Sequence, residues 1–302
     1  MKNRKITPAL KFILPAFIIY TAFLICPLVG SLFYSFFKWQ GIGAMQFVGL
    51  QNYIDLFTKF PYNERLRNAF VNNVLFFLFT LIFQNLIALI IALILSRKLK
   101  GSNAFRFIFF LPTTLSVIIV GYLWTLMLNP TWGSVNLLLK GIGLGSLATP
   151  WLGDTKTALL SITIANAWQY IGIPMMLFTA SINNIDQSIE ESAMIDGCGQ
   201  LKKIRYITLP LLRPILGMET VLVFVANFSA FEIVYAMAGT SAGPMYSTDI
   251  FGTFFYRTLF GEVGGATQDY GMGAAIATIM LLFITLGVVI WINWDKKTDY
   301  SM

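Results

Sequence analysis

The chain has 302 residues, of which 57% are apolar and only 12% are charged. Globular proteins in water carry roughly 45–50% apolar and 25% charged residues, so this composition excludes an ordinary soluble domain and indicates lipid as the solvent. The formal net charge is +7, which in a membrane protein is typical of basic cytoplasmic loops and does not indicate nucleic-acid binding.

Six stretches of the chain are long and apolar enough to cross a bilayer, which takes a helix of roughly 20 residues. Each must be helical, because an isolated strand in lipid leaves its backbone groups unpaired. We therefore predict an all-α integral membrane protein with a single transmembrane domain over 1–302. The predicted spans are 12–37, 70–96, 105–128, 157–181, 214–238 and 270–294.

Lys and Arg residues are distributed unevenly between the loops. The N-terminal segment, the loop at 97–106, the loop at 202–213 and the C-terminal segment together hold twice as many as the loops on the opposite side. Because basic residues concentrate in cytoplasmic loops, we predict a multi-pass protein with both termini in the cytoplasm.

Residues that catalysis would need are scarce. The sequence contains no His and only two Cys residues, Cys26 and Cys198, which removes the commonest general base and excludes a disulfide framework. The run Gly239–Gly243 fits a Gly-x-Ser-x-Gly nucleophile elbow, but that elbow requires a preceding strand and a His partner. We therefore expect no catalytic residue, no metal site and no cofactor in this chain.

The segment 182–213, between the fourth and fifth spans, is longer and more charged than a simple connection requires. Ser188 followed by Glu191 fits a capping box, which predicts a helix over Ile189–Asp196. Gly197 suits the left-handed residue that ends such a helix. The residues themselves leave two interpretations open, a docking element on the cytoplasmic side or merely a link between spans.

A second helical turn is predicted from about Leu201 to Leu209. We expect Pro210 and Pro214 to break it before the fifth span begins, because proline removes a backbone donor. Within that span, Glu219 is expected to be solvated near the cytoplasmic end, whereas Glu232 lies deep among apolar residues.

The loop also resembles a known motif. Glu191-Ser192-Ala193, then Gly197, then Ile207-Thr208-Leu209-Pro210 is similar to the EAA loop of the membrane subunits of binding-protein-dependent ABC importers, with Ser192 in place of the first Ala. Other matches resemble the sugar-permease branch, which includes the maltose and glycerol-phosphate permeases. They comprise 47–53, Leu111-Pro112, Trp124, Asn129-Pro130, Gly133, Asn136, Gly243-Pro244 and 270–275.

This resemblance implies a type I ABC-importer permease fold and a coupling role for the EAA loop, which in the family enters a cleft of a separate ATPase. The residues implied to contact or position that ATPase are Glu191, Ala193, Asp196, Gly197, Ile207, Leu209 and Pro210. The chain has no Gly-Lys dipeptide and hence no P-loop, so ATP and Mg would be bound by the partner ATPase.

The implied partners are a second permease in a heterodimer, two cytoplasmic ATPases, an extracellular solute-binding protein, a sugar substrate and membrane lipid. The implied location is a bacterial or archaeal cell membrane. Nucleic acid is not an expected partner.

The resemblance also implies substrate contacts on the spans that flank the loop. The matching positions are Asn166, Gln169, Tyr170, Asn227 and Ala230, to which we add the deep acid Glu232. For Asn166 and Asn227 the alternative is hydrogen bonding between helices. Glu232 has three open roles, namely a sugar contact, a pair with a partner subunit, or a gate.

Two other classes remain as alternatives, an autonomous secondary transporter or channel for a small polar solute, and a membrane scaffold without transport. Ion-coupled carriers usually hold acidic residues or paired broken helices at mid-membrane. Glu232 is the one acid predicted at that depth, which favours the importer.

Overall fold

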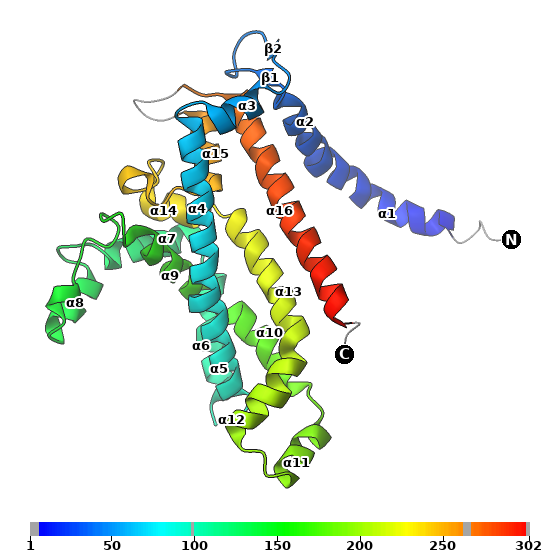
Figure 1. Ribbon diagram of the computed structural model, residues 1–302, viewed down its shortest axis with the longest axis vertical. Coiled ribbons are helices and arrows are strands. Elements are labelled where there is room, and N and C mark those ends of the chain that lie inside the picture. Colours follow the sequence, from blue (N-terminus) through cyan, green and yellow to red (C-terminus); the bar gives the residue numbers. More distant parts are fainter. Residues whose placement is uncertain (1–5, 98–99, 262–266, 300–302) are drawn as a thin grey trace. The chain divides into compact units, whose positions relative to one another are not determined.

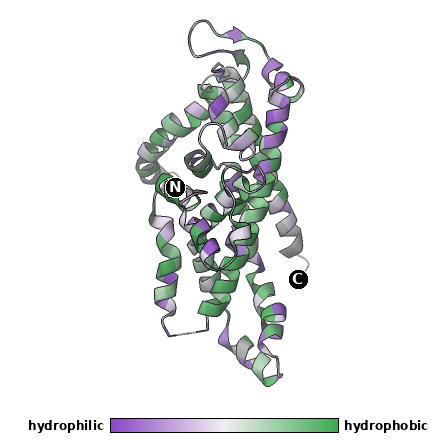
Figure 2. Ribbon diagram, turned by 90° about the vertical axis from the view of Figure 1, so that its left-hand side faces the viewer, coloured by the Kyte–Doolittle hydropathy of each residue, from purple (hydrophilic) through white to green (hydrophobic). Residues whose placement is uncertain are grey.

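The computed structural model describes residues 6–97, 100–261 and 267–299. Helices make up about three quarters of these residues, and hydrophobic residues run along most of their length (Figures 1 and 2). The predicted all-α class is confirmed. Four basic residues used to predict the orientation lie outside the described residues, namely Lys2, Arg4, Lys5 and Lys98.

The chain forms two compact units, which are described separately. The first comprises Met1–Leu66 and Phe255–Leu282. It begins with α1 (Ile6–Tyr20), a π turn η1 (Thr21–Ile25) and α2 (Cys26–Tyr34). These elements provide the apolar stretch Phe12–Tyr34, which is long enough to cross a membrane.

Polar contacts hold together the segment that follows α2. It contains a two-residue antiparallel strand pair, β1 (Phe37–Lys38) and β2 (Gln46–Phe47), and then α3 (Gln51–Thr58). From α3, the Asn52 amide donates hydrogen bonds to the carbonyl oxygens of Ser35 at 2.8 Å and Phe37 at 2.9 Å. Asn52 is buried, so these bonds fix α3 against the end of α2.

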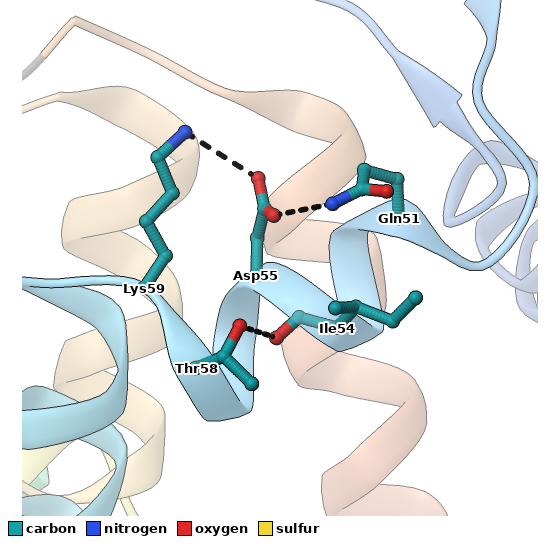
Figure 3. Close-up of polar contacts among 5 residues, drawn as sticks. All are labelled: Gln51, Ile54, Asp55, Thr58 and Lys59. Atoms are coloured by element: carbon teal, nitrogen blue, oxygen red, sulfur yellow. Dashed lines mark hydrogen bonds and ion pairs between the residues drawn. The ribbon is translucent and has the colours of Figure 1, made fainter.

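The polar face of α3 carries a short chain of interactions, drawn in Figure 3. The Gln51 amide donates to the Asp55 carboxylate at 2.7 Å, and Lys59 Nζ lies 3.5 Å from the same carboxylate. The Lys59 side chain is mostly exposed, so this i,i+4 ion pair contributes little to stability.

The second unit comprises Arg67–Phe254 and Phe283–Met302. The second predicted span is one continuous helix over Tyr62–Leu95, built from α4 (Tyr62–Thr80), the π turn η2 (Leu81–Leu86) and α5 (Ile87–Leu95). Its 34 residues extend further toward the N-terminus than the predicted start at residue 70.

The third predicted span is bent. It consists of α6 (Ser102–Phe110), a 3₁₀ turn η3 (Leu111–Thr114) and α7 (Val117–Met127), with 100° between its two halves. Pro112 lies in the turn, and proline lacks the backbone donor that would continue an α-helix through this point. After it come α8 (Ser134–Gly141) and a 3₁₀ turn η4 (Gly145–Leu147).

The fourth predicted span, 157–181, is broken into two helices, α9 (Ala158–Tyr170) and α10 (Gly172–Asn183). They have 13 and 12 residues, each shorter than the roughly 20 that cross a bilayer. Pro174 has no N–H to donate to the carbonyl four residues earlier, which accounts for the break. The described residues thus contain four single helices long enough to span, or five with the bent pair.

The fifth predicted span needs two corrections. The helix does not break at Pro210 and Pro214. One 29-residue helix runs through both prolines and consists of α12 (Gln200–Lys203), the π turn η5 (Ile204–Thr208) and α13 (Leu209–Phe228). The changed hydrogen-bond pattern of a π turn precedes Pro210 and accommodates its missing donor. The helix also ends at Phe228, and Ser229, Ala230 and Phe231 separate it from α14 (Glu232–Ala238).

The last elements are a 3₁₀ turn η6 (Pro244–Tyr246), α15 (Phe251–Phe260) and α16 (Tyr270–Asp299). Within α16 lies the sixth candidate span, Tyr270–Trp294, which agrees with the predicted 270–294.

The described residues of the second unit include two apolar cores. One joins α7, α9 and α14, and the other joins α5, α10 and α13 through Ala88, Ala92, Met175, Phe178 and Leu212. Small residues allow close helix approach in membranes. Gly172 is an example, since a Cβ at this position would lie 2.6 Å from the Phe109 carbonyl oxygen of α6.

Candidate functional site

The loop between α10 and α13 carries an isolated, capped helix, α11 (Gln187–Ile195). Its N-cap is Asp186, whose carboxylate accepts a hydrogen bond from the Ser188 backbone N–H at 2.9 Å. The predicted Ser188 cap is therefore wrong, and the helix starts two residues earlier than predicted because Asp186 is an equally good N-cap residue. The backbone N–H and the hydroxyl of Ser188 hold the pKa of Asp186 below its usual range.

The other end of α11 is closed by Gly197, as predicted. Gly197 has a φ of +69°, its N–H donates to the Met194 carbonyl at 3.1 Å, and the N–H of Cys198 donates to the Ala193 carbonyl at 2.9 Å. This pattern of hydrogen bonds is a Schellman motif. Both ends of α11 are therefore satisfied within the loop itself.

Apolar side chains are exposed on and beside α11. Met194 is 64% exposed, Ile195 is 86% exposed, and Leu201 at the start of α12 is 83% exposed. Figure 1 shows α11 and α12 together at one end of the second unit, beyond the ends of α10 and α13. Because exposed apolar side chains gathered on one element commonly mark an interaction site, this loop has the features of a docking element.

The predicted coupling residues lie on or next to α11 and in the helix that follows it, at η5 and the start of α13. Glu191 is exposed and accepts a hydrogen bond from Gln187 at 2.8 Å, whereas Ala193 is buried. A shallow hollow of about 340 Å³ lies between α11 and η5, and Ala193, Asp196 and Ile207 are among the residues that line it. Leu209 is half-buried and Pro210 is exposed at the start of α13.

A cavity of about 500 Å³ lies within the second unit, among η2, α9, α13 and α14. Its wall includes Ser229, Ala230 and Phe231, the three residues that connect α13 to α14. Irregular backbone at membrane depth is tolerated where it lines a cavity or is buried in protein. The break at Ser229–Phe231 meets this condition, because these residues line the cavity.

Most of the predicted substrate residues meet at this cavity, namely Asn166, Tyr170, Asn227, Ala230 and Glu232. Gln169 does not line it, although it is only three residues from Asn166. Its side chain is fully buried, and its amide donates to the Leu115 carbonyl at 3.0 Å. Gln169 thus connects α9 to the turn between α6 and α7.

Asn227 lines the cavity but already makes hydrogen bonds, both to α4 and within its own helix α13. Its side-chain oxygen accepts a hydrogen bond from the Thr80 hydroxyl at 3.0 Å, and its amide donates to the Val223 carbonyl at 2.8 Å. The Asn73 amide on α4 donates to the Asn227 backbone carbonyl at 2.9 Å. A contact between Asn227 and a solute would use its remaining N–H or the second lone pair of its side-chain oxygen.

Two buried polar residues at the cavity were not predicted as site residues. Gln84 lies in the π turn η2, a feature that is frequent at functional sites, and it is 5% exposed. Glu219 on α13 is only 2% exposed, so the expectation that it is solvated is wrong. The helix begins near Gln200 rather than at residue 214, and this places Glu219 deep inside it. Glu219 and Asn227 are eight residues apart, about two helical turns, and this spacing is the sequence signal that both side chains lie on the same side of α13.

Comparison with known proteins identifies the family of this chain. Residues 84–298 match the family model of the binding-protein-dependent transport system inner membrane component. The probable ABC transporter permease protein YurN of Bacillus subtilis is 34% identical, with 95% of each chain covered. The trehalose/maltose transport system permease protein MalF of Thermococcus litoralis is 28% identical, over 97% of this chain and 95% of that protein.

The fold also matches a solved structure. It is that of a bacterial ABC transporter involved in the import of the acidic polysaccharide alginate, with a TM-score of 0.79 and 23% identity, covering 95% of this chain and 94% of that chain. The family match covers most of the chain, and the apolar helices, the capped loop and the cavity agree with it. This chain is a multi-pass membrane protein that belongs to the family of binding-protein-dependent transport system inner membrane components.

Proposed function

We propose that this chain is the membrane-spanning permease subunit of an ABC importer that moves a sugar or an oligosaccharide, driven by ATP hydrolysis in a separate subunit. The observation that carries this proposal is α11, an exposed helix that is capped at both ends and bears the EAA residues. The sugar cargo is supported by relatives such as the trehalose/maltose permease. It is supported also by a cavity lined with amide, phenol and carboxylate groups, which suit polyhydroxyl ligands.

In this proposal α11 docks into a cleft of the ATPase. Glu191 and the exposed Met194 and Ile195 face the partner, while Ala193 and Ile207 hold α11 against η5. Asp196, Leu209 and Pro210 form the rest of the coupling surface. Gly197 keeps the helix short and rigid, and a rigid element can transmit the rigid-body closure of a partner domain.

The complete importer contains partners beyond this chain. We propose a second permease, similar but not identical, together with two cytoplasmic ATPases that bind ATP and Mg, and an extracellular solute-binding protein. This chain serves as one permease domain in a bacterial or archaeal cell membrane, with both termini in the cytoplasm, and itself needs no cofactor.

The cargo passes through the cavity described above. Asn166, Tyr170, Ala230 and Glu232 line its wall and are the proposed contacts. Glu232 is exposed to this space within the chain, which favours a role toward the cargo or a partner subunit. Gln169 contributes by holding α9 in place.

Reconstitution of the purified subunits in proteoliposomes tests the proposal. We expect sugar uptake to require ATP, the solute-binding protein and a hydrolysis-competent ATPase. Uptake by this chain without the ATPase, driven by an ion gradient, would instead identify a secondary transporter. If the chain were a scaffold, its removal would leave uptake unchanged.

The orientation has its own test. Ile195→Cys, in a variant without Cys26 and Cys198, is expected to react with a membrane-impermeant thiol reagent only in inside-out vesicles. Labelling from the outside of intact cells would contradict the proposed coupling, because the ATPase is cytoplasmic.

A further inference from the structure

Glu219 is an ionisable residue at membrane depth for which the described chain provides no partner. It is 2% exposed, and its Oε2 atom is buried without a hydrogen-bond partner among the described residues. An ionised carboxylate buried without a partner is strongly unfavourable. Such residues inside membrane helices are rare and generally face an interior pathway. A ligand, a bound water or a second subunit would supply the missing hydrogen-bond partner.

The position of Glu219 favours a ligand. Its side chain lines the cavity of about 500 Å³, into which Gln84 from η2 and Asn166 from α9 also project. Gln84 is 5% exposed, so largely buried polar groups from two different helices line this cavity. Gln84 and Glu219 are more buried than the proposed contacts Ala230 and Glu232.

The charge of the cavity is one-sided. Its lining includes two acids, Glu219 and Glu232, and no Lys or Arg among the described residues that form it. In a low-dielectric site, a carboxylate or phosphate on the ligand would be repelled much more strongly than in water. Hydroxyl and ammonium groups, by contrast, would donate charge-assisted hydrogen bonds to these acids.

We infer that Glu219 binds the cargo by accepting its hydrogen bonds, and that this cavity takes saccharides that carry no carboxylate or phosphate group. The inference rests on the proposed function and specifies its substrate class. The fold alone does not set this choice, since a solved relative is involved in the import of the acidic polysaccharide alginate.

Equilibrium binding to the complete importer in lipid nanodiscs tests this inference. The probes are three panels of di- to tetrasaccharides of equal length, one neutral, one built from glucosamine and one built from galacturonate. Glu219→Gln keeps the shape of the side chain and removes its charge. Glu64→Gln is the matched control, because Glu64 is exposed and lies outside the cavity. Elution of each complex in size-exclusion chromatography verifies assembly.

We expect a neutral or glucosamine saccharide to bind, and the galacturonate of the same length to bind at least about 10-fold more weakly. Glu219→Gln weakens the tightest ligand by roughly 10-fold, as expected for a lost hydrogen bond to a charged group. Glu219→Gln also reduces the difference in affinity between that ligand and galacturonate. Glu64→Gln changes neither the affinity nor this difference.

Three results would overturn the inference. One is wild-type binding of galacturonate as tight as that of the neutral saccharide, and another is identical behaviour of the Glu219→Gln and Glu64→Gln variants. The third is a Glu219→Gln complex that falls apart, which would assign the carboxylate to a subunit contact. Binding of no saccharide from any panel would contradict the proposed function as well.

Discussion

Gly197 offers the sharpest test of the coupling loop. Its φ of +69° lies in the left-handed region, which costs an L-residue roughly 1–2 kcal/mol. No atom lies within 4 Å of a Cβ built at this position, so Gly197→Ala introduces backbone strain without a steric clash. The helix that it closes has only nine residues, and helices this short are marginally stable without support at their ends.

The expected consequence follows from that strain. A loss of 1.4 kcal/mol lowers the ratio of formed to frayed α11 about tenfold. We therefore expect Gly197→Ala to reduce stimulation of ATP hydrolysis by the loaded solute-binding protein several-fold in proteoliposomes, with normal membrane insertion. The same comparison with Glu191→Ala examines the proposed contact surface itself.

Gly199→Ala is the matched control. Gly199 lies two residues away, has a φ of −64° and likewise has no atom within 4 Å of a built Cβ. Alanine adopts that conformation without strain, so this variant is expected to retain wild-type stimulation. Gly197→Asn is expected to fall between them, since Asn tolerates the left-handed region. Equal ATPase stimulation in the Gly197→Ala and Gly199→Ala variants would refute the reasoning.

Three further predictions concern other contacts. The pKa of Asp186 is lowered in the folded chain, so its stabilisation of α11 is fully present above the pKa that Asp186 has in the unfolded chain and is lost as pH falls through the lowered value. Hydrogen exchange of the backbone amides in the first turn of α11 measures this stabilisation. Asp186→Asn is expected to remove its pH dependence. Gly172→Ala is expected to destabilise the protein by about 1–3 kcal/mol through overpacking, whereas Gly141→Ala, with no atom within 4 Å of its Cβ, leaves the melting temperature in detergent nearly unchanged. Thr80→Val removes the hydrogen bond to Asn227 and is expected to lower stability by roughly 1 kcal/mol; if Asn227→Leu lowers uptake further than Thr80→Val at equal stability, Asn227 also contacts the cargo.

Hydropathy predicted the helical spans well where one apolar run forms one helix. The spans within Tyr62–Leu95 and Tyr270–Trp294 are examples, because the requirement for internal backbone hydrogen bonding in lipid leaves no alternative to a helix. It failed where proline is present. Pro174 interrupts a run that reads as continuous, whereas Pro210 is accommodated by the preceding π turn, and the sequence pattern does not distinguish these cases.

The site was predicted in part. The EAA pattern located α11 and its closing glycine, although Asp186 and Ser188 are both good N-cap residues and local sequence alone did not decide between them. Glu219 was misplaced because the start of its helix was predicted too late. Burial of an acid depends on which neighbouring helices surround it, and that information is tertiary.

The unbroken helix from Gln200 to Phe228 has a mechanical consequence. Its 29 residues extend roughly 43 Å at 1.5 Å per residue, from the loop that carries α11 to the cavity wall at Ser229. A tilt of about 5° about one end of a helix this long displaces its other end by about 4 Å, so in the proposed importer this helix would act as a lever. A movement of that size exceeds a hydrogen-bond length, so in the proposed importer it would make or break contacts with the cargo.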